Sequence, residues 1–76
     1  MPSLPVLSGQ EVVKVFERLG WEVARRRGSH TIMVKEGHIA TLSIPDHKEL
    51  AKGTLRSLLR SAGLTITEFL EVLQRI

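Results

Sequence analysis

Hydrophobic residues recur at helical spacing near the start of the chain, give way to short β-branched runs in its middle, and return to helical spacing towards its end. In the first segment, Ser8 and Glu11 have the spacing of a capping box, in which each side chain accepts a hydrogen bond from the other residue's backbone amide. The apolar positions that follow at helical spacing are Val12, Val13, Phe16 and Leu19. The pattern therefore predicts a helix that begins at Ser8 and stops at Gly20.

Three short β-prone runs follow from Trp21: WEVARRR, HTIMVKE and HIATLSI. The pair Gly28–Ser29 between the first two suits a two-residue hairpin turn, because glycine adopts the positive φ that the strand twist requires. Pro45 ends the third run, since proline cannot donate a hydrogen bond to a neighbouring strand. These features predict a three-stranded antiparallel meander.

Two more helices are expected after the polar connection PDHKELAKG. The first begins near Gly53 and Thr54 and ends at Gly63, with an apolar stripe formed by Leu55, Leu58, Leu59 and Ala62. A second capping box, Thr65 and Glu68, opens the last helix, over residues 66–75. The expected fold is α+β, in the order α-β-β-β-α with an extra C-terminal helix, and its helices lie on one face of the sheet. Double-stranded-RNA-binding domains have this layout.

We expect one domain over residues 1–76, with residues 1–7 as an extended arm, because 42% of the 76 residues are hydrophobic and 25% are charged. The chain has no cysteine, and its three histidines match no zinc-binding spacing, so neither a metal nor another cofactor is expected. Its apolar runs are too short to span a membrane, and its N-terminus lacks the pattern of a signal peptide. We therefore expect a cytoplasmic protein that does not associate with membranes.

Positive charge is clustered in two places, within a formal net charge of +3 and a pI near 10.0. Arg25, Arg26 and Arg27 are contiguous, and Lys48, Lys52, Arg56 and Arg60 follow one another at steps of four, which would align them on one helical face if the helix begins early. Such clusters favour contact with nucleic-acid phosphates. The alternative is a surface that serves only solubility.

His30 is the candidate for catalysis, because it follows the turn that the three arginines precede. Cleavage of RNA needs a group that accepts and delivers protons near neutral pH, which imidazole does, and cations or N–H groups that face the charge developing on phosphorus. Ser29 and the amides of the turn could hold a phosphate oxygen. The alternative is a packing role: if the strand face of Ile32 and Val34 is the core, His30 lies at the rim of that core.

His47 is the second candidate, in the loop before the basic helix. It could reach a phosphate there, and its neighbour Asp46 could orient or charge it. An ordinary loop histidine is the simpler interpretation, because adjacent side chains often point apart.

Several of these motifs together resemble the HicA family of small toxins, which are mRNA interferases paired with HicB antitoxins. The resemblance covers roughly residues 8–65 and is carried, in order, by Gly20-Trp21, Arg27-Gly28-Ser29-His30, Ile44-Pro45, Lys52-Gly53-Thr54-Leu55-Arg56 and Ala62-Gly63. It implies a double-stranded-RNA-binding-like fold, RNA as the substrate, and cleavage that needs neither a metal nor the ribosome. It also implies a HicB-like antitoxin as partner, and it is compatible with a homo-oligomer or with a heterotetramer of toxin and antitoxin.

The resemblance assigns roles to particular residues. It places His30 at the position of the catalytic histidine, makes Gly28 and Ser29 part of the site that presents it, and makes Lys52 and Arg56 part of an RNA-contacting surface. His47 becomes a candidate for binding or assistance.

Two features depart from the family pattern. Relatives commonly carry an aromatic residue where this chain has Met33, which predicts the loss of a base-stacking contact. The last helix exceeds the minimal toxin and is expected either to cover the core or to bind a partner. The rival functions are a non-catalytic RNA-binding module and a domain that recruits a protein through that helix.

Overall fold

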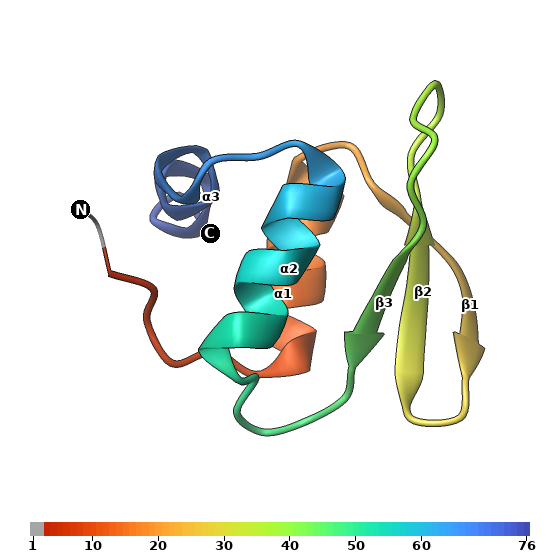
Figure 1. Cartoon of the computed structure of the whole chain (residues 1–76), viewed down its shortest axis with the longest axis horizontal. Coiled ribbons are helices and arrows are strands. Elements are labelled where there is room, and N and C mark those ends of the chain that lie inside the picture. The colour runs from red at the N-terminus through yellow and green to blue at the C-terminus, as the bar shows by residue number, and fades with distance from the viewer. Residues whose placement is uncertain (1–2) are drawn as a thin grey trace.

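The computed structural model describes residues 3–76 of the chain; Met1 and Pro2, the first residues of the predicted arm, lie outside the described part (Figure 1). Its elements are α1 (Gly9–Arg18), β1 (Glu22–Arg27), β2 (His30–Val34), β3 (Leu42–Pro45), α2 (Lys52–Ala62) and α3 (Ile66–Leu73). This order confirms the predicted α+β fold with one helix appended.

Both predicted capping boxes are formed. The Glu11 amide donates to Ser8 Oγ at 3.1 Å and the Ser8 amide to Glu11 Oε1 at 2.9 Å, and Thr65 and Glu68 repeat this exchange at the start of α3. The hydrogen bonds from the capping residues hold the pKa of both glutamates below its usual value.

The helix α2 begins too late in the chain for all four basic residues to share one of its faces, as the sequence analysis expected of a helix that begins early. Lys52 is its first residue, and Ala51 before it is extended, with φ −61° and ψ 138°. Lys48 therefore lies in the preceding loop, so the expectation that it joins Lys52, Arg56 and Arg60 on one face of α2 is wrong for Lys48.

The sheet is a meander in the order β1-β2-β3, with both pairs antiparallel. Gly28 has a φ of 60° at the first position of the β1–β2 turn, while Ser29 after it keeps a negative φ, which is the pattern of a type II′ hairpin. The third strand is shorter than predicted and begins only at Leu42. The residues before it leave the sheet, because the His38 ring packs on Trp21 with ring centroids 5.0 Å apart. The Nδ1 atom of His38 also accepts a hydrogen bond from the backbone amide of Ala40.

The layers run from the sheet to α1 and α2 and then to α3 (Figure 1). Phe16 of α1 connects these layers. Its ring contacts Trp21, the residue before β1, at a centroid distance of 6.2 Å, and Phe69 of α3 at 5.9 Å. In the arm, Leu4 and Leu7 are buried in the same core. The helix α3 therefore covers α1 and α2 rather than the sheet, and it supplies part of the core.

The opposite face of the sheet carries no helix within the described part of the chain (Figure 1). The turn between β1 and β2, the β3–α2 loop and the first residues of α1 and α2 all lie at one end of the molecule, the lower end in Figure 1. This end and the bare face are where the sequence-predicted site residues are found.

Candidate active site

The core lies on the Met33 side of β2, not on the Ile32 side. Met33, which is fully buried, pairs with Leu42, and Thr31 pairs with Ile44; Met33, Leu42 and Ile44 all belong to the core cluster. Ile32 does not belong to that cluster. Alternation therefore places His30 on the bare face, and the alternative that set it at the core rim is wrong. The sequence could not decide this, because β2 is apolar on both faces.

A bulge in β1 decides which arginines share that face with His30. Val23 pairs with Met33 and Arg25 pairs with Ile32, its immediate neighbour on β2, so Ala24 has no partner. In a regular strand, Arg25 would face the helices as Val23 does. The extra residue reverses the alternation, and as a result Arg25 and Arg27 lie on the bare face.

These side chains line a shallow hollow of about 430 Å³, which we call the His30 cleft; its residues are Arg25, Arg27, His30, Ile32, Thr41 and Ser43. His30 pairs across the sheet with Arg27, and Ile32 pairs with both Arg25 and Ser43. His30 is half-buried, whereas both arginines are exposed. The side chains of one histidine and two arginines thus line the same cleft, which is open to solvent.

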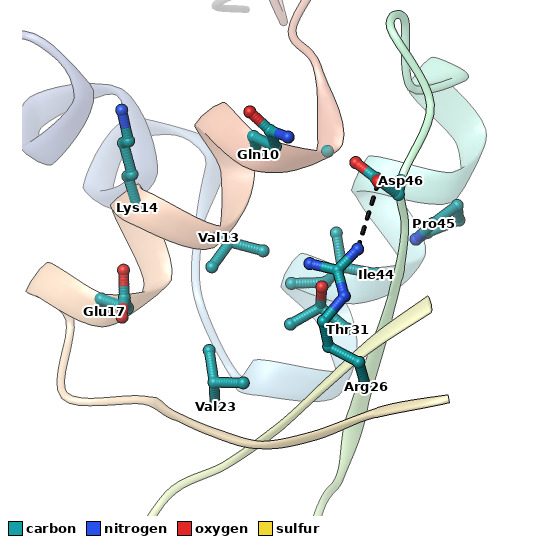
Figure 2. A pocket seen from close by; sticks show the side chains of 11 residues that line it. Gln10, Val13, Lys14, Glu17, Val23, Arg26, Thr31, Ile44, Pro45 and Asp46 are labelled. Carbon is teal, nitrogen blue, oxygen red and sulfur yellow. Dashed lines mark hydrogen bonds and ion pairs between the residues drawn. The ribbon is translucent and has the colours of Figure 1, made fainter. Parts of the chain in front are cut away.

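Arg26 lies on the other side of the sheet, so the structure separates it from its two neighbours. Its guanidinium forms an ion pair with the Asp46 carboxylate at 3.2 Å, at the edge of a hollow of about 260 Å³ between α1 and the strands (Figure 2). Asp46 is therefore bonded to Arg26, and the interpretation that it orients His47 has no hydrogen bond to support it in this structure.

The β3–α2 loop is tied to three other segments by backbone hydrogen bonds. The Asp46 amide donates to the Ser29 carbonyl at 2.7 Å, the Gly9 amide to the His47 carbonyl at 2.9 Å, and the Leu50 amide to the Leu7 carbonyl at 2.7 Å. The hairpin turn, the loop, the first turn of α1 and the arm are thus held together. Ser29 contributes to this through its carbonyl.

The other predicted site residues lie outside the His30 cleft. His47 and Lys48 are exposed and line a separate hollow with Ser8, Gln10 and Asp46. Lys52 and Arg56 are exposed on α2, in the layer on the far side of the sheet. They form a second basic surface and not one site with His30.

Met33 has no part in base stacking, since its side chain is buried in the core. The prediction that a stacking contact is missing at this position is compatible with this burial and stays a prediction. Ile32, Thr41 and Ser43 are lining residues that the sequence analysis missed. The signal that could have found them is the register of β2 with β3, which sets Ser43 opposite Ile32.

Over residues 3–76, the structure contains no group of three or more His, Cys, Asp or Glu side chains placed to hold a metal ion. In the same part of the chain, none of the helices has the length and apolar character needed to cross a bilayer.

The fold and the cleft define a small α+β protein that presents a histidine and two arginines on an uncovered sheet face, an arrangement suited to holding a phosphate next to a proton-transferring group. A family model described as the HicA toxin of bacterial toxin–antitoxin matches residues 9–64. The chain belongs to the HicA toxin family.

A solved structure agrees with this assignment. It is described as a toxin–antitoxin complex from Streptococcus pneumoniae; a chain of it is 37% identical to this protein and superimposes with a TM-score of 0.68. The alignment covers 76% of this chain and 98% of that one. A search of curated proteins gave no significant match.

Proposed function

We propose that this protein is the toxin of a two-component toxin–antitoxin system and that it is a metal-independent endoribonuclease whose acid–base group is His30. Membership of the HicA family supports the toxin role. The observation that carries the enzymatic part is the position of His30 in an open cleft, directly across the sheet from Arg27 and beside Arg25.

The reaction is attack of a ribose 2′-oxygen on the adjacent phosphorus. His30 accepts the 2′-hydroxyl proton, the bond from O2′ to phosphorus forms, and the bond from phosphorus to O5′ breaks. Because the cleft is open to solvent, water protonates the leaving O5′, and the hydroxide that remains takes the proton from His30 and so restores the neutral imidazole. The guanidinium groups of Arg25 and Arg27 stabilise the charge that develops on the phosphoryl oxygens. The products are a 2′,3′-cyclic phosphate and a 5′-hydroxyl end.

The test compares the wild type, His30→Ala and His47→Ala on single-stranded RNA in the presence of EDTA. Loss of the general base is expected to slow cleavage by at least about 100-fold in His30→Ala. His47→Ala should lose less than about tenfold, because His47 lines a different hollow. Circular dichroism verifies that each variant is folded, and end analysis identifies the cyclic phosphate.

Two results would refute this mechanism. Equal cleavage by the wild type and His30→Ala would remove His30 from the reaction. Binding of RNA without cleavage by the wild type, at every pH from about 5 to 8, would favour a non-catalytic RNA-binding module.

An antitoxin is the second partner that we propose. The solved relative is described as a toxin–antitoxin complex, and a protein that covers the His30 cleft would exclude RNA from His30, Arg25 and Arg27. Co-expression with the product of a neighbouring HicB-like gene should therefore restore the growth of cells that the wild-type toxin arrests. His30→Ala alone should not arrest growth.

A further inference from the structure

The His30 cleft extends one cross-strand row beyond His30. In the first row His30 lies between Arg27 and Pro45, and in the second Ile32 lies between Arg25 and Ser43. Residues two positions apart on a strand are about 6.6 Å apart, so a group held at His30 is one short step from Ile32. The cleft volume of about 430 Å³ lies in the range of small-ligand pockets.

The second row is chemically different from the first. Ile32 is an apolar residue at the centre of a sheet face that no helix covers, yet only 7% of its surface is exposed. The exposed hydroxyl-bearing residues Ser43 and Thr41 lie on the β3 side of it, and Arg25 lies on the β1 side. The row thus combines an apolar floor with neutral donors and acceptors on one flank and a cation on the other.

We propose that this row is a subsite for one unpaired base of the RNA, next to the phosphate that is cut, and that Thr41 and Ser43 make the enzyme selective for that base. The proposal rests on the proposed function. A nucleobase has an apolar face, which packs on Ile32, and a polar edge, which the two hydroxyls contact. Hydroxyl groups both donate and accept hydrogen bonds, so their neighbours in the cleft determine which base edge fits best.

The same geometry requires single-stranded RNA at this position. In an A-form duplex the faces of each base are stacked and its edges are paired, and sequence-specific readers therefore use bases that are splayed out of the helix. The charge of the cleft suits this ligand, because Arg25 and Arg27 flank the path on which the sugar–phosphate backbone would lie.

The experiment removes the two hydroxyls and keeps the shape of the cleft. Thr41→Val/Ser43→Ala is compared with the wild type on single-stranded oligoribonucleotides that differ only in the base next to the cleavage point. The matched control is Thr67→Val/Ser61→Ala, which removes exposed hydroxyls from α3 and α2, outside the cleft. We expect the ratios of kcat/KM among the bases to change by about three- to tenfold in the cleft variant, as for the loss of one or two hydrogen bonds, and to stay unchanged in the control.

A second measurement does not depend on cleavage. An oligonucleotide with a 2′-deoxy sugar at the cleavage point binds but cannot react, and NMR amide shifts report where it binds. We expect shifts at Ile32, Thr41 and Ser43. If the wild type cuts no RNA but these shifts appear, the enzymatic proposal fails, whereas the binding of an unpaired base in this row stands.

Three results would overturn the subsite. One is an unchanged base preference in the cleft variant. Another is amide shifts that fall on α2, around Lys52 and Arg56, and not in the cleft. The last is a cleft variant that cuts every base as the wild type does but escapes inhibition by the antitoxin, since the row would then serve protein binding.

Discussion

Replacement of Gly9 by alanine should destabilise this protein, although alanine is the better helix former. Gly9 is the first residue of α1, and its amide donates to the His47 carbonyl at 2.9 Å. A Cβ atom at this position would overlap the carbonyl oxygen of Pro45, and would lie 3.1 Å from the carbonyl carbon of Pro45 and 3.3 Å from Asp46 Cα. All three are backbone atoms, so the β3–α2 loop must move as a unit.

The expected change in the free energy of unfolding of Gly9→Ala is the sum of opposing contributions. Overpacking costs about 1–3 kcal/mol, and a weakened hydrogen bond to His47 costs about 1 kcal/mol. The higher helix propensity of alanine and the lower conformational entropy of the unfolded chain offset about 0.5–1 kcal/mol of this cost. We expect a net loss of about 1–3 kcal/mol, which lowers the Tm of a domain this size by about 4–24 °C.

Gly53→Ala is the matched control, because Gly53 is the second residue of α2 and a Cβ there has no heavy atom within 4 Å. This variant should gain about 0.5–1 kcal/mol. Thermal unfolding followed by far-ultraviolet circular dichroism measures both variants beside the wild type. A Tm for Gly9→Ala equal to or above that of the wild type would refute the close approach of α1 to the β3–α2 loop.

Three further changes test other parts of the structure. Arg25→Gln/Arg27→Gln should reduce the slope of log K for RNA binding against log salt concentration by about 1.4, or about 0.7 for each phosphate contact, whereas Arg26→Gln should leave this slope unchanged. Fluorescence anisotropy at several salt concentrations measures the slope. An equal effect of Arg26→Gln would contradict the separation of the arginines. Phe69→Ala should cost about 3–5 kcal/mol in urea unfolding, because its ring is fully buried, and a loss below about 1 kcal/mol would exclude α3 from the core. Glu11 contributes stability as a carboxylate above its unfolded pKa and loses it as the pH falls through the lowered folded pKa, because its bonds from the capping serine favour the charged form. The Tm advantage of the wild type over Glu11→Gln should therefore shrink between about pH 6 and pH 3, and an advantage that does not change with pH would contradict this.

The helices of this protein could be predicted because their limits are local. A capping box needs only two residues three positions apart, as at Thr65 and Glu68, and a helix stop needs only a glycine such as Gly63, whose φ is 73°. The start of α2 was harder to place, since Ala51 offers no side-chain cap and the polar residues before it fit either a loop or a helix.

The faces of the sheet could not be predicted, because they depend on packing between distant segments. Ile32 and Met33 are both good strand residues, and only the helices opposite select Met33 for the core. The chain leaves the sheet before Leu42 because His38 packs on Trp21, a contact that no local pattern contains.

The run of three arginines shows how one unpaired residue divides identical side chains between two roles. A strand that alternated regularly from Val23 would turn Arg25 and Arg27 towards the helices and leave only Arg26 beside His30. The bulge at Ala24 gives the opposite result: Arg25 and Arg27 share the face of His30, and Arg26 reaches Asp46, whose amide is bonded to Ser29 in the turn that presents His30. An exposed ion pair of this kind contributes at most about 1 kcal/mol to stability. The pair links the β1–β2 hairpin to the loop that carries His47, on the side of the sheet away from the proposed substrate.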